Sequence, residues 1–180
     1  MVVASVHGRA DFGRGAVFPA RSRAVGAIGL QLAALAIRLR QPGAPAWPKL
    51  LSLLIPYNQT WAGGAAALVF VVSKATFTPT GKTEPTVSRS ASFDTGAAWA
   101  SLAIQAHLDG WVAHGMGGFD DAAARVALNV PADHRIEAAV AVGRRGDRAL
   151  LPERYHAGEA PNNRRPLRES VFEGALPDAS

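Results

Sequence analysis

The chain has 180 residues, a length that fits one domain with a real hydrophobic core and is too short for two independent domains. Hydrophobic residues make up 48% of it and charged residues 18%, a composition typical of a globular protein and not of a disordered one. It contains no cysteine, which excludes disulfides, thiolate metal sites and a cysteine nucleophile. Any redox chemistry would therefore need a bound cofactor, and we expect no metal site.

The net charge of +5 comes from 19 basic and 14 acidic residues, and many of the basic ones lie in two clusters, Arg9–Arg40 and Arg144–Arg168. A basic cluster is typical of nucleic-acid binding. Here the arginines are not interleaved with aromatic residues that could stack on bases, and no zinc, helix-turn-helix or RNP-like motif accompanies them. We therefore predict that nucleic acid is not a partner.

One apolar run, Ala24–Leu39, is the nearest approach to a membrane segment. It is interrupted by Gln31, is flanked by arginines, and is shorter than the roughly 20 residues that a membrane span requires. It also begins too far from Met1 for an ordinary signal peptide. We expect a cytoplasmic protein with no membrane partner.

The first 40 residues contain no clear signals for the start or end of a helix or strand. From Gln41-Pro42-Gly43 onward, glycine and proline residues mark the ends of the predicted elements. We therefore divide the chain into an atypical N-terminal segment, 1–40, and a single domain, 41–180. The domain opens with a predicted amphipathic helix over Trp47–Ile55 that Pro56 ends, and a short helical turn over Asn58–Trp61. The run Ala65–Val72 predicts a buried strand.

The polar stretch Thr76–Arg89 predicts a loop, because it holds Pro79, Gly81 and Pro85. A long helix, Thr95–Leu108, is expected to follow, with Ser92 or Asp94 as its cap. The remaining elements are predicted in this order: a strand over Trp111–His114, a glycine turn over Gly115–Gly118, a helix over Asp120–Leu128, a strand over Ile136–Val142, and an extended arm beyond Arg145. This order predicts an α+β sandwich with a small mixed or antiparallel sheet and a long central helix.

The stretch Ser92–Asp120, SFDTGAAWASLAIQAHLDGWVAHGMGGFD, resembles the nitroreductase-like flavoproteins. The similarity rests on an Asp-x-Gly-Ala start, a Leu-x-Leu-Gln-Ala type of helix, an aromatic strand and a Met-Gly-Gly-Phe-Asp turn. It extends over about three quarters of the chain through further short matches, at Trp47, Leu50, Leu51, Asn58, Trp61, Ala62, Ala123–Arg125, Asn129–Pro131, Ala141–Gly143, Leu151–Pro152 and Glu159–Leu167. The order and spacing of the fragments make the resemblance specific.

The resemblance implies an FMN enzyme that works as an intertwined homodimer with the flavin at the subunit interface. Such an enzyme takes hydride from NADH or NADPH and passes electrons to a nitro compound, a quinone or a related small molecule. Because the flavin carries the redox chemistry, the protein needs no acid–base pair or metal, and the catalytic residues stay unassigned. The alternatives are a non-enzymatic remnant that keeps the fold and its dimerising core but binds flavin poorly, and a basic binding protein.

The resemblance also places Met116, Gly117 and Gly118 against the flavin ring, with the backbone N–H of Met116 or Gly117 near the flavin N5. Glycine permits such an approach because no Cβ intervenes. The alternative interpretation is a plain strand-to-helix turn that Asp120 caps.

Arg164 and Arg165 match the basic residues of the family's C-terminal arm that meet the FMN phosphate. A guanidinium group can bind two phosphate oxygens at once, which makes arginine suitable for this position. The alternative is that both arginines belong to a solvated charge cluster, like Arg144, Arg145 and Arg148.

Other side chains are weaker candidates. His114 precedes the glycine turn, but a histidine in such a place more often packs or hydrogen-bonds structurally than donates a proton. Asp94 is expected to cap a helix rather than act as a base. Trp99, Trp111 and Phe119 are expected to make core or dimer contacts rather than to stack on the flavin.

Two family motifs are missing from residues 1–40: an Arg-Arg-Ser-x-Arg opening that binds the FMN phosphate, and a Ser-x-x-Asn-x-Gln-Pro-Trp motif that lines the flavin. When Arg21–Arg40 is back-translated with permitted codons and read one base later, it becomes EAARWAPSAYNSQPWRFAY, which contains the second motif. Few residue types are reachable at each step, so a chance match to the ordered motif is improbable. We hypothesise that part of this region was translated out of frame, with the frame restored near Arg40–Gly43.

This hypothesis has two consequences for the written chain. Ala24–Leu39 would form a helix at most, by composition, and would make no native-like flavin contact. The chain as written would then bind FMN weakly, although the rest of the domain keeps its family pattern.

Overall fold

The computed structural model describes residues 3–4, 35–39, 46–161 and 163–176. Its centre is an antiparallel sheet built around the long strand β7 (His134–Arg145). The strand order is β1 (Val3–Ala4), β7, β3 (Ala67–Lys74) and β2 (Leu35–Leu39), and β6 (Val112–Met116) also pairs with β7. Every pairing among the described strands is antiparallel, so of the two predicted sheet types the antiparallel one is found.

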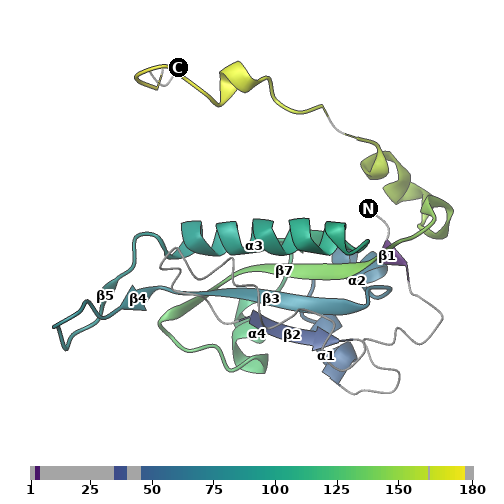
Figure 1. The fold of residues 1–180 in the computed structure, drawn as a ribbon. Coiled ribbons are helices and arrows are strands. Elements are labelled where there is room, and N and C mark those ends of the chain that lie inside the picture. Colours follow the sequence, from purple (N-terminus) through teal and green to yellow (C-terminus); the bar gives the residue numbers. More distant parts are fainter. Residues whose placement is uncertain (1–2, 5–34, 40–45, 162, 177–180) are drawn as a thin grey trace.

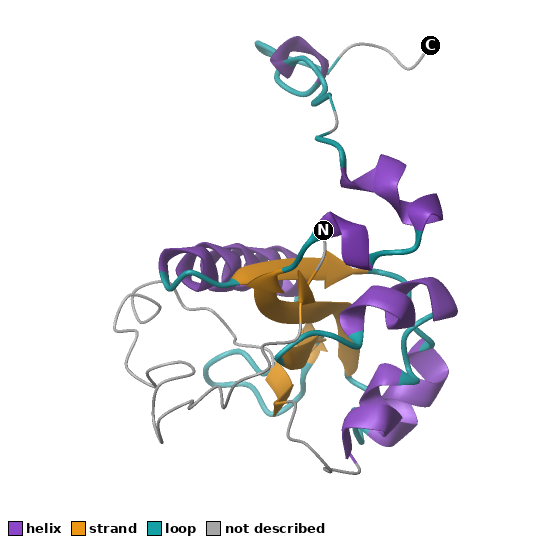
Figure 2. Cartoon of the chain, turned by 90° about the vertical axis from the view of Figure 1, so that its right-hand side faces the viewer, coloured by secondary structure: helices purple, strands orange, loops and turns teal. Residues whose placement is uncertain are grey.

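Helices cover both faces of the sheet (Figures 1 and 2). The long helix α3 (Ala91–Leu108) runs along one face, whereas α1 (Ala46–Leu51), α2 (Pro56–Ala62) and α4 (Asp121–Ala127) lie on the other. This arrangement follows from β3, whose residues are buried from Ala67 through Ser73. A strand that is apolar on both of its faces must be covered on both sides.

The side chains of the central strands alternate between two cores. Leu68, Phe70 and Val72 belong to the core on the side of α1 and α2, and Phe119 packs against this core. The second core lies on the other face of the sheet and contains Ala67, Val69, Val71, Val140 and Val142. Trp99 and Trp111 pack against it. Trp99, Trp111 and Phe119 therefore make core contacts, one of the two roles expected for them.

The start of α3 differs from the prediction. The helix begins at Ala91 after Ser90, four residues before the predicted Thr95, so that both predicted caps lie inside it. Asp94 lies in the first turn, where its Oδ2 accepts a hydrogen bond from Ser90 Oγ at 2.9 Å. The Ser92 hydroxyl donates instead to Glu137 Oε1 of β7 at 2.7 Å, a contact that sequence alone does not reveal.

Two further predicted boundaries were wrong. The stretch Thr76–Arg89 is not all loop, because β4 (Thr76–Phe77) pairs with β5 (Thr86–Val87) to form a small hairpin that projects from the body (Figure 1). The first helix ends at Leu51 rather than at Pro56, because Leu54 leaves the helical path to form a bridge with Phe119.

The predicted helical character of Ala24–Leu39 was also wrong where the structure describes it. Leu35–Leu39 forms strand β2, which pairs with β3 in a register that places Leu35 opposite Val71 and Leu39 opposite Ala67. Apolar residues alternate with Ala36 and Arg38 in this stretch, and this period of two suits a strand. The rest of the N-terminal segment, apart from Val3–Ala4, lies outside the described residues.

The chain after β7 forms the predicted arm, which contains the short 3-10 helices η2 (Arg148–Leu150), η3 (Glu153–Glu159) and η4 (Leu167–Glu169). The arm leaves the end of the sheet and extends away from the body (Figure 1). Its root is attached to α2, since the ring of Tyr155 meets that of Tyr57 edge-on at 4.9 Å. Among the described helices, none is both long and apolar enough to cross a membrane.

Candidate functional site

The glycine turn between β6 and α4 is shorter than predicted. Gly115 belongs to β6, where it pairs with Val140, and only Gly117 and Gly118 lie between the strand and Phe119. A Cβ on Gly115 would meet the Trp99 ring of α3 at 3.3 Å, so this glycine serves packing. Met116 is 4% exposed and belongs to the core, so its side chain faces the protein interior.

The turn is hydrogen-bonded to α2 and to the segment that leads into it. The carbonyl oxygen of Gly118 accepts hydrogen bonds from the backbone N–H of Ile55 at 3.1 Å and from Asn58 Nδ2 at 2.9 Å. Two residues later, the Asp120 N–H donates to Leu53 O at 2.8 Å. Asp120 also accepts from the Ala123 N–H, which makes it the N-cap of α4.

Gly117 and Gly118 differ sharply in the space around them. A Cβ built on Gly118 would lie 2.6 Å from Ile55 Cδ1 and 2.8 Å from Asn58 Nδ2, whereas a Cβ on Gly117 would have no neighbour within 4 Å. Gly118 is therefore needed for packing against α2. Gly117 faces open space, as a position that approaches a ligand would.

We expect two glycine substitutions to affect different properties, one the stability of the fold and the other the affinity for a ligand. Gly118→Ala should lower the free energy of unfolding by about 1 to 3 kcal/mol, because the new methyl group overlaps Ile55 and Asn58. Gly117→Val should cost less than about 0.5 kcal/mol, as at an ordinary surface position, but should raise the dissociation constant of a ligand bound against this turn at least about tenfold. Urea denaturation and ligand titration of both variants check this. If Gly117→Val loses neither affinity nor stability, the turn is a simple connection.

His114 lies on β6, two residues before Met116 and on the same face of the strand. Its ring contacts that of Trp61 with the centroids 4.7 Å apart. Burial lowers the pKa of His114 below the usual value of 6.5, so the ring is neutral at neutral pH. A histidine packed on a tryptophan fits the structural role expected for it.

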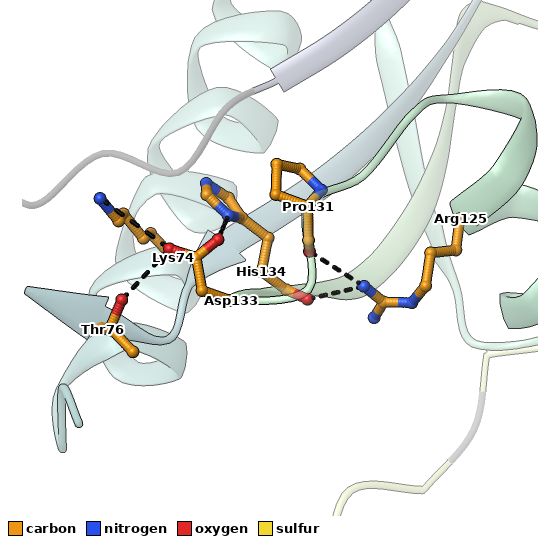
Figure 3. A network of polar contacts seen from close by, with 6 residues as sticks. All are labelled: Lys74, Thr76, Arg125, Pro131, Asp133 and His134. Carbon is orange, nitrogen blue, oxygen red and sulfur yellow. Dashed lines mark hydrogen bonds and ion pairs between the residues drawn. The ribbon is translucent and has the colours of Figure 1, made fainter. Parts of the chain in front are cut away.

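A second polar cluster occupies the loop between α4 and β7 (Figure 3). Arg125 Nη1 donates to the carbonyl oxygens of Pro131 and His134, at 3.2 and 3.0 Å. Asp133 accepts from Thr76 Oγ1 at 3.2 Å and lies 2.7 Å from His134 Nδ1, a contact that holds the pKa of Asp133 below its usual value. These contacts fix the loop and the base of the β4–β5 hairpin, so we assign the cluster a structural role.

Arg164 and Arg165 lie on the arm between η3 and η4, and both are exposed. Within the described residues of this single chain, no hydrogen bond or ion pair joins either arginine to the glycine turn. One chain therefore brings Met116, Gly117 and Gly118 together but not the two arginines.

The residues that support the turn, Ile55 and Asn58, were not predicted as site residues. Asn58 is 8% exposed in a helix whose other buried residues are Trp61 and Ala62. A buried amide among apolar neighbours is a signal that a specific hydrogen bond is made there. Its partner, 60 positions away, was not readable from the sequence.

The chain is similar to known proteins over most of its length. The model of the nitroreductase family matches residues 29–144. An uncharacterised 15.4 kDa protein of Mycolicibacterium smegmatis is 35% identical over 125 residues, which are 69% of this chain and 80% of that protein. A crystal structure described as an oxidoreductase containing FMN is 38% identical with a TM-score of 0.73, and the match covers 79% of this chain and 72% of that one.

More distant structures share the fold. A nitroreductase family protein from Clostridium difficile 630 is 18% identical with a TM-score of 0.55, over 81% of this chain and 76% of that one. An FMN- and NADPH-dependent nitroreductase from Sphigopyxis sp. strain HMH is 13% identical with a TM-score of 0.53, over 82% and 81%. Since the family model covers more than half of the chain and a relative is 35% identical over most of its own length, the chain belongs to the nitroreductase family.

Proposed function

We propose that this chain is the protein part of an FMN-dependent oxidoreductase that uses NADH or NADPH to reduce a nitro compound, a quinone or a related small acceptor. Membership of the nitroreductase family and the 38% identity to an oxidoreductase containing FMN support a flavin enzyme in general. The observation that carries the proposal is the glycine turn, which is held firmly on its inner side and open at Gly117.

The residues of the turn fit a flat ring. Gly117 leaves a surface without a side chain, and Gly118 continues it because its own Cβ position is filled from the inside by Ile55 and Asn58. A bound FMN would supply the redox chemistry, accepting hydride from the nicotinamide and delivering two electrons to the acceptor. The backbone of Met116, Gly117 and Gly118 would hold and orient the ring.

Arg164 and Arg165 are the proposed ligands of the FMN phosphate. They lie on the arm, which extends away from the body of the chain (Figure 1). We therefore propose that they complete the site in a homodimer, where an arm reaches toward the second copy. Two adjacent guanidinium groups would supply the positive charge and the paired donors that a phosphate requires.

The outer face of α3 supports the homodimer. Phe93, Ala97, Ala100, Ile104 and Leu108 recur every three or four residues and form one exposed stripe, which we call the α3 stripe. Three of its members are large apolar side chains that are 80%, 62% and 72% exposed, namely Phe93, Ile104 and Leu108. A stripe of this kind suits a contact with the same stripe of a second copy.

The NADPH dependence of the Sphigopyxis enzyme supports a nicotinamide donor but does not choose between NADH and NADPH here. The second candidate function is a non-enzymatic remnant that keeps the fold and binds flavin poorly. The absence of the family's two N-terminal motifs from residues 1–40 favours it.

One experiment separates these functions. The purified protein is incubated with FMN and desalted, and its absorbance and its oxidation of NADH or NADPH with a quinone or nitroaromatic acceptor are measured. The flavin oxidoreductase should stay yellow and should oxidise the nicotinamide only when FMN and acceptor are both present. A colourless protein without such activity, still folded by circular dichroism, would support the remnant.

A further inference from the structure

The Gly118 carbonyl oxygen is the meeting point of two distant parts of the chain. It accepts one hydrogen bond from the Ile55 N–H at 3.1 Å and a second from Asn58 Nδ2 at 2.9 Å. Asn58 lies in α2, 60 positions earlier, and is 8% exposed. A buried side-chain amide stabilises the structure only where it is hydrogen-bonded, so this contact is a specific restraint on the turn.

The neighbouring carbonyl is restrained as well. Gly117 O accepts a hydrogen bond from the Phe119 N–H at 3.2 Å, which is the i to i+2 bond of a γ-turn. The described peptide bonds are all trans, so the N–H of Gly118 points away from the Gly117 carbonyl. No hydrogen bond from the Gly118 N–H is found in the part of the chain that the structure describes.

Both ends of the turn are also anchored. Met116 pairs with Ala139 in the sheet, and Phe119 forms a bridge with Leu54 and packs its ring edge-on against Phe70 with the centroids 5.9 Å apart. Between these anchors, the orientation of the two glycine peptides depends on what holds their carbonyl groups, because glycine itself restricts φ and ψ very little.

We infer that Asn58 is a positioning residue: by holding the Gly118 carbonyl toward α2, it fixes the Gly118–Phe119 peptide, whose N–H is bonded to Gly117 O, and through this γ-turn it orients the Gly118 N–H so that it can donate to an acceptor atom of a bound flavin. This inference rests on the proposed function for the identity of the ligand. The restraint on the turn itself does not depend on it. Asn58 touches no ligand in this scheme and acts through Gly118.

The test compares Asn58→Leu and Asn58→Asp with Gln59→Leu in the full chain. Asn58→Leu replaces the amide by an apolar group of similar size, and Asn58→Asp keeps the shape but removes the N–H₂ donor. Gln59→Leu is the matched control, because Gln59 Nε2 donates to the Leu54 carbonyl at 2.6 Å from the same helix. Each protein is titrated with FMN by quenching of flavin fluorescence, and denaturation and amide hydrogen exchange are measured without FMN.

Both Asn58 variants should bind FMN about tenfold more weakly than the unmodified chain, the size expected for the loss of one well-placed hydrogen bond. Exchange of the Phe119 amide, whose N–H donates to Gly117 O, should speed up by a similar factor. Gln59→Leu should change affinity and turn exchange less than about twofold, even at an equal loss of stability. Unchanged FMN affinity in both Asn58 variants, or an equal loss in Gln59→Leu, would overturn the inference.

The experiment still tests the role of Asn58 if the proposed function is wrong. A chain that does not bind FMN at all contradicts the flavin function, and the exchange measurement then decides the role of Asn58 alone. Faster exchange confined to the turn supports the restraint, whereas exchange that is unchanged or raised across β3 and β7 as well contradicts it. If Asn58→Leu fails to fold, Asn58→Asp supplies the same comparison.

Discussion

Replacing the written N-terminal stretch Arg21–Leu39 by EAARWAPSAYNSQPWRFAY, with an Arg-Arg-Ser-x-Arg opening before it, should tighten FMN binding on the order of a hundredfold, or about 2.8 kcal/mol. The replacement restores basic residues for the phosphate, whose charge-assisted hydrogen bonds are among the strong ones in proteins, and polar residues along the flavin. Titration of the written and the repaired chains with FMN measures the difference.

Strand β2 bears on this expectation. It covers Leu35–Leu39, and the shifted reading places Trp, Phe and Tyr at the positions of Leu35, Ile37 and Leu39. Aromatic residues at alternate positions favour a strand, as do the written leucine and isoleucine residues. Both readings are therefore compatible with pairing to β3, so the strand by itself does not test the frame.

The control for the repaired chain changes only Leu35–Leu39 to Trp-Arg-Phe-Ala-Tyr and leaves the preceding residues as written. It separates a better strand from restored cofactor contacts, and its FMN affinity should stay close to that of the written chain. If the written chain already binds FMN as tightly as the repaired one, the frame hypothesis fails, and the first 40 residues must supply a site of their own. Sequencing the gene tests the same hypothesis directly.

Placing a charge in the α3 stripe should convert the expected homodimer to a monomer. Ile104→Lys would put an ammonium group at the centre of an apolar contact, and an unpaired buried charge of this kind should raise the dimer dissociation constant by at least about a hundredfold. Because Ile104 is 62% exposed in the single chain, the fold should tolerate the change. Light scattering at micromolar concentration measures the mass.

Val126→Lys is the matched control. Val126 is an apolar residue that is 84% exposed on α4, which covers the opposite face of the sheet. This variant should remain dimeric and bind FMN as before, whereas Ile104→Lys should also lose FMN, since the site is proposed to need the partner's arm. An unmodified chain that is already monomeric at micromolar concentration would contradict the homodimer proposal.

Much of the fold was predictable because the determining signals are local. The run from Val69 to Val72 can only be satisfied by burial on both faces, which predicted β3, and the periodic small and apolar residues before Leu108 predicted the long helix. Boundaries were less predictable where a side chain has a distant partner. Ser92 resembles a helix cap, but its hydroxyl donates a hydrogen bond to Glu137, and the helix begins after Ser90 instead.

The candidate site divides along the same line. Gly117 and Gly118 were predicted from the motif, but the motif does not distinguish them, and only the packing shows that Gly118 is required by α2 while Gly117 is open. Arg164 and Arg165 were predicted from the arm, and their proposed role in phosphate binding requires a second copy of the chain. Neither the difference between the two glycines nor the use of the two arginines can be predicted from neighbouring residues in the sequence.

By itself, the sequence determined the α+β class, the central strands, the long helix, the arm and the glycine turn, because hydrophobic periodicity and the conformational limits of glycine and proline act over a few residues. Only the tertiary structure decided that Leu35–Leu39 is a strand, that Gly115 belongs to the sheet, and that Asn58 holds Gly118. Each of these depends on a partner far away in the chain. Burial and hydrogen bonding between distant segments are settled only when the whole fold forms.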